Sequence, residues 1–111
     1  MIAKHYKDVP LEREADGQKA GIRWLISKKE GAENFAMRMI EVEAGGSTPL
    51  HSHPWEHEVF VVEGESTVQI LDEYQHIEKG YIVFIPSGLK HTFKNSGKKV
   101  MKMICSIPLK K

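Results

Sequence analysis

The sequence predicts an all-β fold, either a sandwich or a barrel built from short strands. Bulky and β-branched residues recur in short runs with partial two-residue alternation, a pattern typical of strands. Turn residues separate these runs at close spacing, and no segment develops an amphipathic helical face of useful length. Many short strands joined by tight turns favour one layered or closed sheet.

The expected strands follow one another from the first quarter of the chain almost to its end. The first two runs are bulky and partly alternating, and the later runs continue in the same style. The segment 11–16 could form a single helical turn. Strands are expected over residues 22–26, 35–42, 57–63, 67–71, 81–85, 90–93 and 100–107, with turns at 45–46, 64–65, 72–73, 86–88 and 95–97.

Length and composition predict one globular domain over residues 1–111. Apolar residues make up 41% of the chain and charged residues 28%, which is ordinary for a folded protein and too apolar for a disordered one. Within it we expect N-terminal strands in 1–33 and a core barrel in 34–107. The closing pair Lys110 and Lys111 is expected to be a solvated tail.

Charge and cysteine content argue against nucleic acid and membrane partners and against an intrachain disulfide. The formal charge of +1 comes from 16 basic and 15 acidic residues mixed along the chain, so no basic face for nucleic acid or anionic membrane is expected. Cys105 is the single cysteine, and no intrachain disulfide can form. The N-terminus lacks an apolar signal core, and the apolar runs are too short to span a bilayer, so a cytoplasmic location is the default expectation.

Four histidines are the candidate functional residues. His51, His53 and His57 lie within seven residues of one another, and His91 comes later in the chain. Imidazole is the commonest protein ligand for first-row transition metals. On a strand, residues two apart point to the same face, so His51 and His53 can project together. If the strands that carry the four histidines are neighbours in one barrel, the sequence predicts a metal site.

The strand that starts at His57 has a predicted orientation. If the imidazole points inward, two-residue alternation also sends Val59 and Val61 inward, and Glu58 and Phe60 outward. Glu56 and Glu58 could orient a ligand imidazole by accepting a hydrogen bond from its other ring N–H, or they could be solvated acidic residues at a barrel rim.

Several apolar residues are candidates for the lining of a pocket. Met37 and Met39 flank Arg38, and Met101 and Met103 flank Lys102, so we expect these methionines to face the interior together with Cys105. Such residues could fill the core adaptably or shape a pocket for a small hydrophobic substrate. Cys105 could lie near enough to a metal to be oxidised, or it could be a buried inert thiol. The candidates for a second shell or pocket are Glu56, Glu58, Met37, Met39, Phe93, Met103 and Cys105.

Glycines and a proline frame the histidines at regular spacings. Gly45 leads across five residues to His51 and His53, and His57 is followed by Gly64. The second segment carries Gly80, Pro86, Gly88, His91 and Asn95.

These two segments resemble the paired motifs of the cupin superfamily. The second motif matches at every named position, and the two motifs together cover about a third of the chain. The resemblance implies a cupin double-stranded β-helix, which is a jelly-roll barrel, with a metal held by the histidines. It also implies a homodimer that exchanges strands at the N-terminal end, with residues 22–26 as the candidate contact. Outward apolar residues such as Phe60 and Val62 agree with a covered surface.

One position departs from the usual cupin motif. Where most members have a glutamate, this chain has His57, so the chain is most similar to small single-domain cupins with an all-histidine site, including manganese-containing members. The resemblance therefore implies a divalent transition metal, manganese first, with iron, nickel, copper and zinc left open. Four neutral imidazoles would leave the charge of the ion uncompensated and attract anionic ligands. An octahedral ion would keep two positions for substrate and an oxidant, whereas zinc could form a closed structural site.

Three functions remain open from the sequence. The first is a metal-dependent dioxygenase or related oxidoreductase acting on a small organic substrate, in which the histidines serve only as ligands and no general base stands out. The second is a module that binds a small ligand or metal without turnover. The third is a purely structural ion. One fold hosts many activities, so the resemblance does not assign the reaction.

Overall fold

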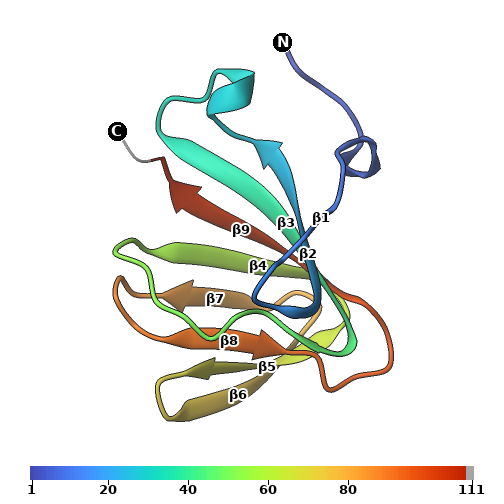
Figure 1. The fold of residues 1–111 in the computed structure, drawn as a ribbon, viewed down its shortest axis with the longest axis vertical. Coiled ribbons are helices and arrows are strands. Elements are labelled where there is room, and N and C mark those ends of the chain that lie inside the picture. Colours follow the sequence, from blue (N-terminus) through green and yellow to red (C-terminus); the bar gives the residue numbers. More distant parts are fainter. Residues whose placement is uncertain (110–111) are drawn as a thin grey trace.

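A computed structural model describes residues 1–109 of the chain and contains nine strands and two short 3₁₀ helices in that part (Figure 1). The all-β prediction is confirmed. The expected tail, Lys110 and Lys111, lies outside the described residues. The elements are η1 (Tyr6–Asp8), β1 (Glu12–Arg13), β2 (Gln18–Ile26), η2 (Lys28–Glu30), β3 (Phe35–Ser47), β4 (His57–Glu63), β5 (Glu65–Ile70), β6 (Glu73–Glu78), β7 (Ile82–Ile85), β8 (His91–Lys94) and β9 (Met101–Pro108).

The strands form one sheet that curls upon itself. Its order is β6-β5-β8-β3-β9-β4-β7, and β2 pairs with β3 and carries β1 on its other side. The long strand β3 joins the two halves, because it pairs with β2 and β9 along most of its length and meets β8 at Ser47. In Figure 1 the strands descend from β2, β3 and β9 through β4, β7 and β8 to β5 and β6. This curled sheet is the jelly-roll barrel that the motifs predict.

Two-residue alternation builds the core inside the barrel. Along β4, His57, Val59 and Val61 are buried while Glu58 and Phe60 are exposed, which confirms the predicted orientation of this strand. Along β9, the inward residues Met101, Met103 and Cys105 are each at most 2% exposed and belong to the same core cluster. Apolar side chains on one face of each strand therefore fill the barrel.

The predicted orientation of β3 is wrong. Its inward residues are Arg38, Ile40 and Val42, and the last two join the core cluster. Met37 is 38% exposed, and Met39 is buried but lies on the opposite face of the strand. The prediction assumed that a charged side chain between two methionines must face water. Arg38 is instead buried inside the barrel, where it is 8% exposed.

Two strands were not expected from the sequence. The segment predicted as a possible helical turn contains β1, whose residues Glu12 and Arg13 pair with Ile22 and Gly21 of β2. The polar segment after residue 72 forms β6, which pairs with β5 at the edge of the sheet. In β6 only Ile77 is buried, so the usual alternation is absent. Edge strands commonly carry charged residues, which hides them from a search for apolar periodicity.

The N-terminal segment is tied to the barrel by polar contacts. The Arg23 Nη1 donates a hydrogen bond to the Val9 carbonyl oxygen at 2.6 Å, and the Lys102 Nζ donates to the Tyr6 hydroxyl at 2.9 Å. Among residues 1–109, no helix is both long enough and apolar enough to cross a membrane.

The motif residues around the histidines have structural roles. The buried Asn95 donates through Nδ2 to the carbonyl oxygens of Val42 and Lys99 at 2.8 and 2.7 Å, and its Oδ1 accepts from the Gly97 amide at 2.9 Å. Gly64 has a φ of +80°, and an added Cβ would lie 2.7 Å from the Val100 carbonyl oxygen. The motif thus fixes the backbone on either side of the candidate site.

Candidate metal centre

Backbone pairing brings the two histidine segments together. The His51 amide donates to the His91 carbonyl oxygen at 3.3 Å, and the His91 amide donates to the His51 carbonyl oxygen at 3.0 Å. This pair is an isolated bridge, so His51 and His53 lie in an otherwise irregular segment rather than on the strand that the sequence predicts. Their rings still project to the same side, with centroids 4.2 Å apart.

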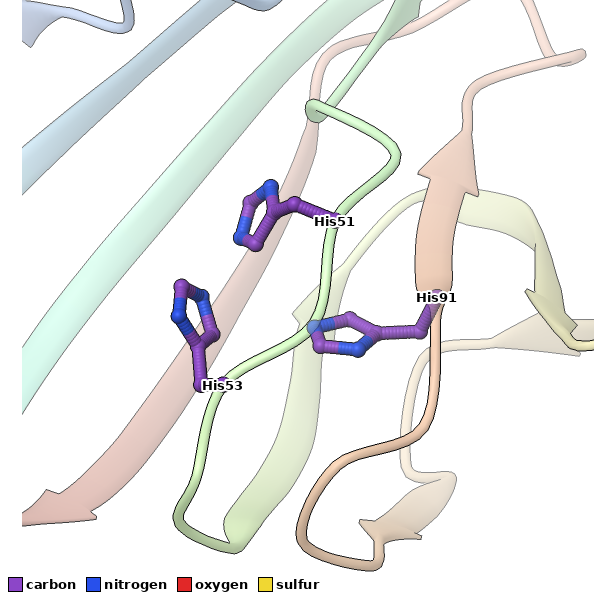
Figure 2. Close-up of side chains that lie close together, drawn as sticks. All are labelled: His51, His53 and His91. Atoms are coloured by element: carbon purple, nitrogen blue, oxygen red, sulfur yellow. The ribbon is translucent and has the colours of Figure 1, made fainter.

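Three of the four predicted ligands converge. His51, His53 and His91 each offer a ring nitrogen, and these nitrogens all lie within 4.8 Å of one another. In Figure 2 the His51 and His53 rings project to the same side of the irregular segment, and the His91 ring extends from the start of β8 towards them. His57 is not part of this set, although its ring centroid lies 4.8 Å from that of His91 and 5.1 Å from that of His53. His57 would have to approach the other three for one ion to bind all four.

His57 has one ring nitrogen with partners and one without. Its Nδ1 lies 3.2 Å from the Cys105 Sγ and 3.4 Å from the Arg38 Nη2. Its Nε2 is buried and has no hydrogen-bond partner among the described residues. Buried polar atoms are rarely left unpaired, because each loses its hydration without compensation. The unpaired Nε2 therefore points to a missing partner such as a metal ion.

The ring of His91 is held in a fixed tautomer. Its Nδ1 lies 2.9 Å from the Leu89 carbonyl oxygen, which can only accept a hydrogen bond. Nδ1 must therefore carry the proton, and Nε2 keeps its lone pair. Metal-binding histidines commonly donate their other N–H to a carbonyl or carboxylate in this way.

Burial favours the neutral form of three of the imidazoles, which is the form that a metal requires. The pKa of His57 is lowered to about 3, mainly by burial and further by the charges of His91, Arg38, His53 and His51. Burial is also the main cause that lowers the pKa values of His51 and His91. Neutral imidazoles with available lone pairs suit a divalent transition metal, so the residues present fit such an ion.

The histidines face a cavity of about 680 Å³ inside the barrel. Its walls combine apolar side chains from four strands with the candidate ligands, and its mouth includes acidic residues from β1 and the following turn. A cavity of this size, mostly apolar with a few polar groups, is typical of a site for a small molecule. Lining residues include Trp24, Ile40, Trp55, Phe93, Met103, Cys105 and Ile107.

Only some of the predicted pocket residues line this cavity. Phe93, Met103 and Cys105 do so, whereas Met37 and Met39 do not, because alternation along β3 turns Arg38 and Ile40 inward instead. Glu56 and Glu58 are exposed and do not line it either, since they flank the inward His57.

Trp24 and Arg38 are among the cavity residues that sequence reasoning missed. Both line the cavity, and the Arg38 guanidinium carbon lies 5.4 Å from the centroid of the Trp24 ring. Arg38 lies two and four residues before Ile40 and Val42, so it shares their face of the strand. This spacing could have predicted a charged side chain inside the barrel. Trp55 also lines the cavity, and its ring stacks on His53 with centroids 4.6 Å apart and planes 6° from parallel.

Comparisons with known proteins point to one family and several relatives. A family model described as "Cupin domain" matches residues 38–107. Among solved structures, the polyketide cyclase RemF from Streptomyces resistomycificus is 32% identical, with a TM-score of 0.91 over 99% of this chain and 80% of that chain. A predicted oxalate decarboxylase from Thermotoga maritima is 22% identical, with a TM-score of 0.85 over 98% of this chain and 100% of that one.

Among curated proteins, the matches cover less of the relative. Protein SchB from Streptomyces halstedii is 29% identical over 93 residues, which are 83% of this chain and 66% of SchB. Nectarin-1 from Nicotiana plumbaginifolia is 40% identical over 70 residues, which are 57% of this chain and 30% of nectarin-1. The chain thus spans less than two thirds of either curated relative.

Proposed function

The chain belongs to the cupin domain family, and from this premise we propose that it is a metal-dependent enzyme acting on a small organic substrate. The observation that carries the proposal is the group of three imidazole nitrogens within 4.8 Å of one another at the wall of a 680 Å³ cavity. A metal site with a large, mostly apolar chamber beside it suits a substrate that approaches the ion directly.

The proposed ligands are His51, His53 and His91, with His57 as the fourth. The unpaired Nε2 of His57 supports its inclusion. Manganese is the first candidate, and iron, nickel, copper or zinc would also accept imidazole. When bound, a divalent ion would supply Lewis-acid or redox chemistry to a substrate oxygen.

The surrounding residues would bind the substrate and keep water away. Ile40, Phe93 and Met103 line the inner cavity and present apolar surface to it. Trp24 and Trp55 also line the cavity, and their flat rings suit an aromatic or conjugated substrate. A low-polarity cavity strengthens every electrostatic interaction between the site and a charged oxygen of the substrate.

The likeness to RemF supports one reaction class in particular. RemF is a polyketide cyclase, and its similarity extends over 99% of this chain. We therefore propose ring closure of a carbonyl-rich chain, a reaction in which carbon–carbon bond formation needs polarised carbonyl oxygens and no external oxidant.

A dioxygenase or related oxidoreductase is the second candidate. The observation that favours it is the all-imidazole character of the proposed ligand set. Without a carboxylate ligand the charge of the ion is uncompensated, and an octahedral ion would keep two positions for a substrate and an oxidant.

Turnover with and without oxygen separates these functions. The protein would first be purified without added ions or an affinity tag, and its metal content measured. It would then be incubated with a poly-β-carbonyl substrate under air and under argon. A cyclase gives the same product at the same rate in both, whereas an oxygenase consumes oxygen and stops under argon.

His91→Ala is the loss-of-ligand control, and turnover that survives in this variant would contradict the metal-dependent proposal. Stabilisation by the substrate without any turnover would instead indicate a binding module. A purely structural ion predicts that metal removal unfolds the barrel rather than leaving a folded, inactive protein.

The domain organisation and assembly are part of the same proposal. We place the core barrel in 34–107 and a homodimer contact in 1–33. Ile26 of β2 is 43% exposed and does not line the cavity, which supports an apolar contact at this strand.

A further inference from the structure

Arg38 is a buried cation inside the cavity. It is 8% exposed and lines the cavity together with the four histidines. Its strand neighbours on the same face, Ala36 and Ile40, are apolar, so nothing local favours a charge there. Placing a guanidinium in such surroundings is costly unless a partner compensates its charge.

The described residues do not supply an anionic partner for Arg38. Its Nη2 donates to the Cys105 Sγ at 3.0 Å, and its Nε is buried without a hydrogen-bond acceptor. No ion pair within residues 1–109 includes Arg38. The acidic residues at the cavity mouth, Glu12, Glu14 and Asp16, therefore lie beyond ion-pair distance.

The shape of the cavity indicates what could compensate the charge. Arg38 lies beside aromatic surface, since its guanidinium packs over Trp24 and the cavity continues to Trp55 and Phe93. An arginine presents several donors in one plane and suits a carboxylate, enolate or phenolate oxygen. The aromatic walls suit a flat apolar body attached to that oxygen.

We propose that Arg38 is a substrate-binding residue that selects organic anions, holding the charged oxygen of a ligand whose flat apolar body lies between Trp24, Trp55 and Phe93. This inference deepens the proposed function, because it names the charge of the substrate, but binding itself requires no turnover. A bound divalent ion would add further positive charge to the cavity and favour the same class of ligand.

The experiment uses a matched pair of probes, 2-naphthoate and its neutral analogue 2-naphthamide. Their binding to the full chain is measured by calorimetry, both as purified with known metal content and after metal depletion. The chain has two tryptophans, and both line the cavity, so their indole N–H signals in nuclear magnetic resonance spectra report whether the probe binds there.

We expect the wild-type protein to bind the naphthoate about 10- to 100-fold more tightly than the amide, and both indole signals to shift. Arg38→Met keeps the length and apolar stem of the side chain and removes the charge, and it should abolish this preference. Arg38→Lys retains the charge without the planar fork and should retain part of the preference. Arg23→Met is the control, because Arg23 pairs with Glu41 and does not line the cavity.

Equal affinity of the wild-type protein for the two probes would overturn the inference, as would an unchanged naphthoate preference in Arg38→Met. The first of these outcomes needs no variant, so a folding defect in Arg38→Met cannot obscure the result. Charge-selective binding without turnover would contradict the proposed function alone. Turnover with no role for Arg38 in anion binding would contradict this inference alone.

Discussion

The His57 imidazole contacts a buried thiol, that of Cys105. In metal sites, the second ring nitrogen of a ligand histidine more often contacts a carboxylate or a carbonyl oxygen. The Cys105 Sγ lies 3.2 Å from the His57 Nδ1 and also accepts a hydrogen bond from Arg38. If Nδ1 carries the proton, His57 donates to the sulfur and its Nε2 keeps a lone pair. This is the tautomer that metal binding requires. Sulfur is a weaker acceptor than a carboxylate, so His57 would be a less basic ligand.

Removing single histidines should distinguish three ligands from four. His91→Ala should lose most of the bound metal, because His91 belongs to the converging set of three. His57→Ala should retain metal with weaker affinity, because His57 lies outside that set. Elemental analysis and competition with a chelator measure both effects. His76→Ala is the control, since His76 is exposed and contacts Glu65. Full metal content with unchanged affinity in His91→Ala would contradict the assignment.

The metal-free protein should lose stability on acidification. The pKa of His57 falls from 6.5 to about 3 on folding, so between these values the unfolded chain binds more protons than the folded one. The free energy of unfolding should therefore fall as the pH decreases from about 6.5 towards 3. When the pH is raised again, the free energy of unfolding should return to its value at neutral pH. Urea unfolding at several pH values measures the slope. His57→Gln should make the slope shallower, and an identical slope in this variant would contradict the explanation.

At the scale of elements, β3 links the fold to the site. It pairs with β2, β8 and β9, and its inward face carries Arg38. Ser47 at its end pairs with Lys94, and the Thr92 hydroxyl donates to the Thr48 carbonyl oxygen at 2.6 Å. These contacts hold the histidine segment after β3 against β8, so β3 positions candidate ligands that it does not itself contain.

Asn95 should be the most sensitive polar residue in this connection. Asn95→Ala removes three hydrogen bonds of a buried side chain and leaves the carbonyl oxygens of Val42 and Lys99 without these donors. We expect the free energy of unfolding to fall by about 2–4 kcal/mol. Thermal or chemical unfolding measures the change. Ser96→Ala is the control, because it changes the neighbouring exposed residue and should alter stability by less than about 0.5 kcal/mol. Equal effects of the two substitutions would contradict this role.

The sequence predicts most strands but not all their orientations. Strands β4 and β9 alternate cleanly, so the inward positions of His57, Val59 and Cys105 follow from two-residue periodicity. The same reasoning fails for β3. Met37 and Met39 were expected to face the interior because Arg38 lies between them, but Arg38 is the residue that faces inward. Strand β6 escapes prediction because its stability comes from pairing with β5 rather than from burial.

The candidate site is predictable in its residues and less so in its geometry. Motif spacing identifies the four histidines, yet it places His51 and His53 on a strand. In the structure His51 forms an isolated bridge with His91, and the His53 carbonyl oxygen accepts a hydrogen bond from the Gly88 amide. Spacing also cannot show that His57 stands apart from the other three. Such distances depend on how the curled sheet brings remote segments together.

At the scale of the whole molecule, apolar surface remains exposed on the outside of the barrel. Phe60, Ile82 and Phe84 on β4 and β7 are 48%, 79% and 52% exposed. Paired strands bring Phe60 beside Ile82 on one face. Exposed apolar groups of this kind often mark a protein interface.

The proposed homodimer can be tested by its mass in solution. Light scattering at micromolar concentration should give twice the chain mass of 12.6 kDa. Ile26→Glu places a charge in the expected contact at β2 and should shift the protein towards monomer. Leu71→Glu is the control, because Leu71 is also exposed, at 52%, but lies at the turn between β5 and β6. A monomeric wild-type protein would refute the assembly.

Two backbone hydrogen bonds between His51 and His91 set the spacing of these two positions independently of their side chains. Main-chain atoms hold the two positions together, so the scaffold keeps them adjacent whatever side chains they carry. Evolution or a protein engineer could therefore exchange an imidazole for a carboxylate or a thiolate without rebuilding the barrel. Single substitutions at these positions could then change which metal such a scaffold prefers.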